Sequence, residues 1–160
     1  GQQQSVAVTT DDNLLGWVET EVENGKLKIE TTGNIRPQAG LVVNVTLPEL
    51  RGARVSGAGN LNVEGVQGQE LELALSGAGD LRANGYVNRV STKISGAGSA
   101  DLQQLVAENA KVKISGAGHA DVFATQSVDA DISGAGSVDC YGNPPDVQRH
   151  VSGVGSIKLR

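Results

Sequence analysis

The sequence predicts an all-β protein, a single-stranded, right-handed parallel β-helix (solenoid) of about 19 residues per coil with an N-terminal hairpin and strand cap. The phrase Ser-Gly-Ala-Gly, or Ser-Gly-Val-Gly in the last copy, begins at Ser56, Ser76, Ser95, Ser115, Ser133 and Ser152. The intervals of 20, 19, 20, 18 and 19 residues indicate repeats that pack on their neighbours. Within the repeats, apolar and polar residues alternate, as in Leu71–Leu75, which is typical of half-buried strands.

The first fifty residues lack the phrase but carry strand signals. The chain begins Gly-Gln-Gln-Gln and contains no Met, so we expect a trimmed start and the removal of an export signal. Two alternating stretches, Trp17–Val22 and Lys26–Ile29, flank Asn24-Gly25 and predict a β-hairpin. Leu41–Leu47, ended by Pro48, predicts another strand. We therefore expect residues 1–50 to form a β cap continuous with a β-helix over residues 51–160, covering its first edge.

Three apolar columns emerge when the repeats are aligned on the serine. The residue before each serine is Val55, Leu75, Ile94, Ile114, Ile132 or Val151. Five residues after it come Leu61, Leu81, Ala100, Ala120, Val138 and Ile157, and two residues further come Val63, Ala83, Leu102, Val122, Cys140 and Leu159. A looser apolar position, ten residues after the serine, holds Val66, Tyr86 and Leu105, and the pattern weakens in later copies, which have Thr125 and Asn143 there. We expect these columns to face the interior, and the charges of the last strand, Ile157–Arg160, to protect its edge.

The glycines of each phrase leave two arrangements open. If strict alternation persists, both glycines, such as Gly57 and Gly59, face inward and allow close backbone approach. If the chain turns there, they supply positive φ angles and the alanine points inward. In either arrangement, valine at Gly96 or Gly116 should cost more stability than an ordinary surface change.

Composition excludes several classes of function. The chain has 18 acidic and 13 basic residues, a net charge of −5, and no long Lys/Arg cluster, so nucleic acid and anionic membranes are poor partners. No apolar stretch approaches the roughly 20 residues of a membrane span, so we expect no membrane insertion of this segment. Cys140 is the only cysteine, which rules out an intramolecular disulfide, and its apolar column predicts a buried, inert thiol.

The repeated phrase, the segment Val45-Thr-Leu-Pro48 and the ending His150–Lys158 resemble the head GIN domain of putative auto-transporter adhesins. The resemblance covers essentially the whole chain. It implies a β-helical module of the bacterial envelope, frequent in Bacteroidetes and usually preceded by an export or lipoprotein signal. It implies a location in the periplasm, at the outer membrane surface or outside the cell, and it transfers no functional residues.

A search for catalytic chemistry predicts no catalytic or cofactor-binding residue. The chain has two histidines, His119 and His150. His119 occupies a position that takes various polar residues, which is typical of a solvated surface. The repeated serine precedes its glycines and no helix follows, so it does not form a nucleophile elbow. We expect the serines to form a hydrogen-bonded structural ladder.

The most distinctive polar column is acidic. Asp101, Asp121 and Asp139 align, after Asn62 and Arg82 and before Lys158. We expect three solvated acids with no bound metal; the alternative is that a hard cation such as Ca²⁺ neutralises the repulsion between the stacked carboxylates. Asp101 and Asp121 are also the acids that a polysaccharide-processing groove would use, with an aromatic platform from Trp17, Tyr86, Phe123 or Tyr141.

The leading functional hypothesis is a non-enzymatic, cofactor-free envelope module, an adhesin head or rigid interaction domain that contacts a surface protein or glycan. The alternative is a polysaccharide-binding or polysaccharide-active β-helix with Asp101, Asp121 and an aromatic in one groove. A third possibility is end-to-end self-association, because solenoid ends expose strand edges.

Overall fold

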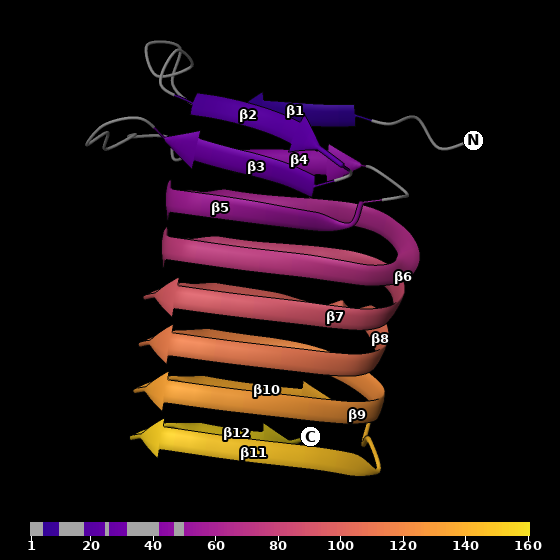
Figure 1. Cartoon of the computed structure of the whole chain (residues 1–160), viewed down its shortest axis with the longest axis vertical. Helices are drawn as coiled ribbons and strands as arrows, with labels where there is room; N and C mark the ends of the chain where they lie inside the picture. The colour runs from indigo at the N-terminus through magenta and orange to yellow at the C-terminus, as the bar shows by residue number, and fades with distance from the viewer. Residues whose placement is uncertain (1–4, 10–17, 25, 32–41, 47–49) are drawn as a thin grey trace.

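The computed structural model describes residues 5–9, 18–24, 26–31, 42–46 and 50–160, and these form strands without a helix. The chain winds into a flattened coil whose turns stack along one axis (Figure 1). Four long strands each pass from the rear of the coil, around one end, to the front: β6 (Asn60–Ala78), β7 (Asp80–Gly96), β8 (Ser99–Gly116) and β9 (His119–Gly134). The predicted parallel β-solenoid is confirmed, because successive turns pair in parallel.

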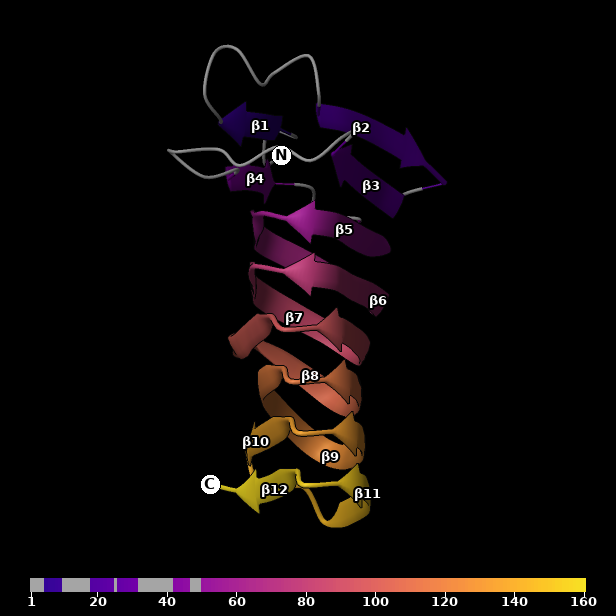
Figure 2. The ribbon, with the colours of Figure 1, turned by 90° about the vertical axis from the view of Figure 1, so that its left-hand side faces the viewer.

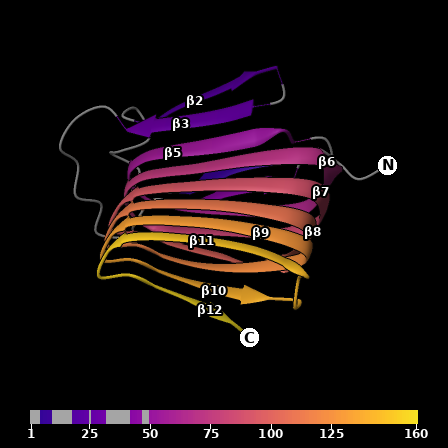
Figure 3. The same ribbon diagram turned by 60° about the horizontal axis from the view of Figure 1, so that its bottom comes forward.

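Two parallel sheets make up the coil. The front sheet contains β5 (Gly52–Ala58), the later halves of β6 to β9, and β11 (Asp146–Gly153). The rear sheet contains the first residues of β6 to β9, then β10 (Ser137–Tyr141) and β12 (Ser156–Leu159). As the chain descends in Figure 1, front strands run from right to left and rear strands run from left to right, so the coil is right-handed; Figure 3 shows the same path from below.

The N-terminal strands extend both sheets upward. The predicted hairpin is present as β2 (Val18–Glu23) and β3 (Lys26–Thr31), with Asn24 at a positive φ of 52°. β3 pairs in parallel with β5 of the front sheet. The predicted strand is β4 (Val42–Thr46), which pairs in parallel with the start of β6 and antiparallel with β1 (Ser5–Thr9) (Figure 2).

The ends of these predicted elements, Trp17, Leu41 and Leu47 among them, lie outside the described residues. The domain boundary between residues 50 and 51 stays a prediction.

The three predicted apolar columns form the core between the two sheets. Their members are buried in every coil up to Cys140. Val151 and Leu159 of the last coil are exposed, because no further coil covers them in this structure. Burying these columns supplies the main stabilising free energy, since each added coil removes its neighbour's apolar side chains from water.

The expectation that the looser fourth position faces the interior was wrong at Tyr86. This side chain is 45% exposed and donates a hydrogen bond of 2.8 Å to Glu108, which raises the pKa of Tyr86, whereas Val87 is buried. The register between β6 and β7 shifts at this point, so Gly85 lies level with Val66 of the preceding coil. A β-bulge changes which residue faces inward, and a fixed offset from the serine cannot detect it.

At each phrase the chain turns, but the alanine does not point inward as that arrangement predicted. The first glycine has a positive φ in all six copies, for example 122° at Gly96 and 130° at Gly116. The alanines are exposed, and Val154 in the same place is 90% exposed. The second glycine faces the core instead: a Cβ on Gly118 would lie 2.8 Å from Ile94 Cγ2. Both glycines are therefore required, one for its backbone angle and one for space.

The bend is itself hydrogen-bonded to the coil before it. Ala117 N donates to Gly96 O at 2.9 Å, and His119 N donates to Gly98 O at 3.1 Å. A Cβ on Gly116 would collide with the carbonyl oxygen of Gly96. The parallel ladder thus continues from the front sheet through the bend into the rear sheet.

We expect Gly116→Ala to lower the free energy of unfolding by about 2–5 kcal/mol, because it combines a left-handed φ with a backbone collision. Gly68→Ala is the matched control, since nothing lies within 4 Å of its added Cβ. Urea unfolding should show a change of no more than about 0.5 kcal/mol for the control. Equal stability of the two variants would contradict the role assigned to the bend.

Thr92 is a buried side chain whose Oγ1 has no hydrogen-bond partner. It stacks on Val112, which occupies the same column in the next coil. Thr92→Val should raise the free energy of unfolding by about 1–2 kcal/mol by removing an unsatisfied hydroxyl, and the reverse change Val112→Thr should lower it by a similar amount. Thermal unfolding of both variants checks the pair, and a destabilised Thr92→Val would show that the hydroxyl is satisfied.

Candidate functional site

The outer face of the rear sheet carries polar side chains in columns. Buried residues alternate with outward ones along β9, where Ala120 and Val122 point into the core. His119, Asp121 and Phe123 therefore share the outer face. β10 lies in register below β9 and adds Ser137, Asp139 and Tyr141 to the same face.

The predicted acidic column is confirmed as a structural ladder. Asp101 pairs in register with Asp121, and Asp121 with Asp139. Arg82 precedes them and Lys158 follows, as the alignment of repeats indicated. Three solvated acids without a bound metal stay the prediction for this column, with calcium binding as the alternative.

The three carboxylates have different surroundings. The side chain of Asp101 is 52% exposed, and its Oδ2 lies 3.9 Å from Arg82 Nε. Asp121 and Asp139 are only 18% and 16% exposed. Asp139 Oδ1 lies 3.4 Å from Arg160 Nε, while Asp121 faces an imidazole. The ladder therefore has a solvated upper member and two members largely withdrawn from water.

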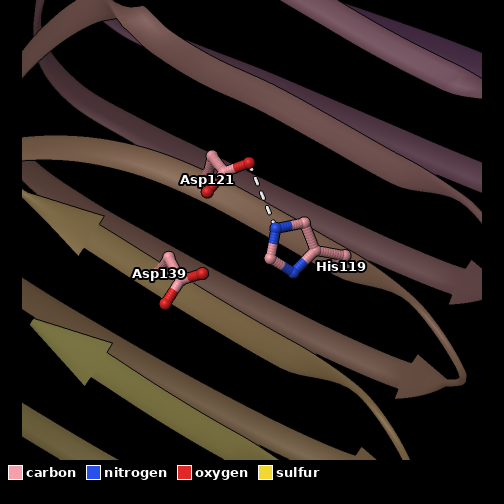
Figure 4. Close-up of side chains that lie close together, drawn as sticks. All are labelled: His119, Asp121 and Asp139. Atoms are coloured by element: carbon pink, nitrogen blue, oxygen red, sulfur yellow. Dashed lines mark hydrogen bonds and ion pairs between the residues drawn. The ribbon is translucent and has the colours of Figure 1, made fainter. Parts of the chain in front are cut away.

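His119 belongs to this group, although the sequence pattern predicted only a solvated surface position. Its Nε2 lies 3.1 Å from Asp121 Oδ2, and its Nδ1 lies 2.7 Å from Ser137 Oγ (Figure 4). The available signal was spacing: residues two apart on a strand share a face, and Asp139 follows one coil later. His150 lies elsewhere, exposed on β11 of the front sheet, in register with Asp131.

His119, Asp121 and Asp139 are close enough to hold a metal ion together. One potential ligand atom from each lies within 4.8 Å of those of the other two. The group contains one imidazole nitrogen and two carboxylates, and it combines two adjacent coils (Figure 4). Asp101 is not part of it.

Two aromatic residues continue this surface toward the far end of the strands. Phe123 and Tyr141 are in register and half-buried. Phe123 also lies against the backbone of the following turn, because a Cβ on Gly142 would meet Phe123 Cε1 at 3.0 Å. The rear face thus combines an aromatic pair with carboxylates, an imidazole and a hydroxyl.

A polysaccharide groove formed by Asp101, Asp121 and an aromatic stays a prediction. A hollow of about 290 Å³ is lined by Asp101 with Arg82, Asn84 and Gln104, without Asp121 or an aromatic. Trp17 lies outside the described residues. A larger hollow of about 640 Å³ lies near the first coil and is lined mainly by polar residues, including Lys26, Arg51, Glu70 and Glu72.

The repeated serines stack in register along the front sheet. Within residues 50–160, no hydrogen bond joins one hydroxyl of this column to the next, so the predicted hydroxyl ladder is not formed. Their contribution is positional: each immediately precedes the glycine at which the chain turns.

The front face differs in character from the rear face. Lysines and aspartates oppose each other on neighbouring coils, with Lys111 Nζ 2.8 Å from Asp129 Oδ2 and Lys113 Nζ 3.7 Å from Asp131 Oδ2. The Asp129 carboxylate raises the pKa of Lys111 through this hydrogen bond. Opposite charges on this face therefore neutralise each other, each exposed pair contributing little to stability.

Among the residues that the structure describes, there is no helix long and apolar enough to cross a lipid bilayer.

Comparison with known proteins finds one matching family and similar solved structures. Residues 1–144 match the family described as "Putative auto-transporter adhesin, head GIN domain". A crystal structure of a putative adhesin from Bacteroides fragilis is similar with a TM-score of 0.71 at 20% sequence identity, covering 99% of this chain and 83% of that chain. A crystal structure of a putative lipid binding protein from Parabacteroides distasonis has a TM-score of 0.54 at 25% identity, covering 99% and 85%. No curated protein matches the sequence significantly.

Cys140 is fully buried, and burial raises the pKa of its thiol. We expect a thiol reagent such as DTNB to label the native protein at least a hundredfold more slowly than the urea-unfolded chain, since the thiolate is the reactive form. An unfolded thiol ionises near a pH of about 8.5, so this group lowers the free energy of unfolding as the pH rises beyond that value. Rapid labelling of the native protein would contradict the buried assignment.

Proposed function

Because this chain belongs to the auto-transporter adhesin family with the head GIN domain, we propose that it is a non-enzymatic interaction module of the bacterial cell envelope. The surface or envelope location follows from the family. The finer assignment, an adhesin head that binds a surface protein or glycan, is supported by the shape and chemistry of the rear face.

The observation that carries the proposal is the rigid, regular outer face of the rear sheet. Its strands are fixed by parallel pairing to both neighbours over most of the rod and by hydrogen bonds through each bend. Outward side chains are therefore held at a repeat of about 4.8 Å without loss of further backbone entropy on binding. A preorganised sheet face suits attachment to an extended partner better than it suits enclosure of a small substrate.

Polysaccharide binding is a second candidate function, and one specific feature of the described surface supports it. Phe123 and Tyr141 form an aromatic pair. Each lies two residues beyond an aspartate, Asp121 or Asp139, on the same strand and the same face. Aromatic rings with adjacent hydrogen-bonding groups supply an apolar platform together with polar specificity. Lipid binding, the function suggested for the Parabacteroides distasonis neighbour, receives no comparable support from these hollows, which are lined mainly by charged and polar residues.

We expect the purified domain to bind an extended envelope or host-surface component through the rear face. Binding to arrays of bacterial and host glycans and to envelope protein extracts should weaken at least tenfold in Asp101→Lys, which alters the rear face. Asp129→Lys is the matched control, since it places the same change on the front face at similar exposure. Equal losses in both variants would contradict a rear-face contact, and turnover of a polysaccharide panel by the domain would contradict a non-enzymatic role.

End-to-end association of two rods stays a prediction, which sedimentation at increasing protein concentration tests. Binding assays are therefore made at concentrations where the domain sediments as one species.

A further inference from the structure

We propose that His119, Asp121 and Asp139 form a binding site for a divalent transition-metal ion such as Zn²⁺. Their potential ligand atoms lie within 4.8 Å of one another on the outer face of the rear sheet. The inference does not rest on the proposed adhesive function, and it differs from a calcium ladder because Asp101 has no part in it.

The two ring nitrogens of His119 face different neighbours. Ser137 Oγ lies 2.7 Å from Nδ1 of His119, and the opposite nitrogen, Nε2, faces Asp121 at 3.1 Å (Figure 4). When Nδ1–H donates to the serine hydroxyl, Nε2 carries a lone pair and points it at the carboxylate. Two electron-pair donors then face each other, and a cation between them satisfies both.

The charge balance of the two aspartates favours a cation at the same point. Asp121 and Asp139 stand on adjacent coils, in register, and both side chains are more than four-fifths withdrawn from solvent. Arg160 neutralises Asp139, whereas within the described residues the ion-pair partner of Asp121 is His119, which is charged only when protonated. Two like charges at this spacing repel in a partly desolvated place, and a divalent ion removes that repulsion.

The ligand set selects the class of metal. Calcium and magnesium take oxygen ligands, and an imidazole nitrogen in the set disfavours both. One nitrogen and two carboxylate oxygens suit Zn²⁺ and its neighbours in the transition series. Three protein ligands leave a fourth position for water or for a donor group of a binding partner, since His119 is partly open to solvent.

The surroundings also provide the outer support that metal ligands usually have. Ser137 holds the far nitrogen of His119, and Arg160 contacts the Oδ1 atom of Asp139. These contacts orient the ligands while leaving Nε2 and the second carboxylate oxygen of Asp139 for the metal. Because the strands are fixed in register, closure of the site relies on side-chain rotations and not on sliding of the strands.

Isothermal titration of the metal-stripped domain with ZnCl₂ at neutral pH tests the proposal, with Co²⁺ absorption as a spectroscopic readout of nitrogen and oxygen ligation. We expect one ion per chain, and a visible Co²⁺ spectrum, for the native sequence. His119→Gln and Asp121→Asn should each weaken Zn²⁺ binding at least tenfold and remove the Co²⁺ bands. Circular dichroism checks that both variants retain the strand spectrum.

Two matched controls keep the result specific. His150→Gln removes the other histidine of the chain, and Asp101→Asn removes the ladder aspartate outside the group. Both should bind Zn²⁺ within about twofold of the native sequence, and CaCl₂ should give no comparable binding. The proposal is overturned if the native domain does not bind Zn²⁺, if His150→Gln loses binding as His119→Gln does, or if Asp101→Asn loses binding as Asp121→Asn does.

Discussion

Backbone hydrogen bonds between coils do not stop at the corner of the coil, and the rest of the structure depends on this continuity. The carbonyl oxygen of Gly96 receives the amide of Ala117, and the carbonyl oxygen of Gly98 receives the amide of His119. A side chain at either glycine position would occupy the space of the neighbouring coil. With the corner locked, the coil cannot slide by a residue, and every position must stack on its equivalent.

Stacking of equivalent positions has opposite consequences for apolar and charged side chains. Apolar columns gain from it, because each coil buries its neighbour. Charged columns lose from it, and the front face responds by opposing Lys111 to Asp129 and Lys113 to Asp131. The rear face instead stacks three aspartates and supplies each with a different partner: Arg82, His119 or Arg160. The chemistry of the rear face therefore arises from a column that the repeat would otherwise disfavour.

The fold was predictable from the sequence because its signals repeat. The period, the three apolar columns and the buried Cys140 each follow from patterns that recur in neighbouring coils. The hairpin at Asn24 follows instead from a strong local turn signal between two alternating stretches. Local departures were not predictable. The bulge that exposes Tyr86 and buries Val87 occurs between two particular coils, and the outward direction of the alanines depends on which of two glycines turns the chain.

The grouping of His119 with Asp121 and Asp139 was missed for a related reason. The aspartates were recognised as members of one column, whereas the histidine lies in the adjacent outward column and occurs in one coil alone. Column-by-column alignment compares a residue with its equivalents and not with its diagonal neighbours. The distances between side-chain atoms supplied that relation.

Because the corners of successive coils are equivalent, the length of the rod can change without a change in its ends. Because Gly96 and Gly116 turn the chain in the same way, with φ angles of 122° and 130°, the coil that lies between them begins and ends in equivalent places. Loss or duplication of one such period would join matching ends, shortening or lengthening the rod by about 4.8 Å while leaving the cap and the last coils as they are. The distance from the N-terminal strands to the group of His119, Asp121 and Asp139 can thus change by one coil at a time during evolution, without a change in the chemistry of that group.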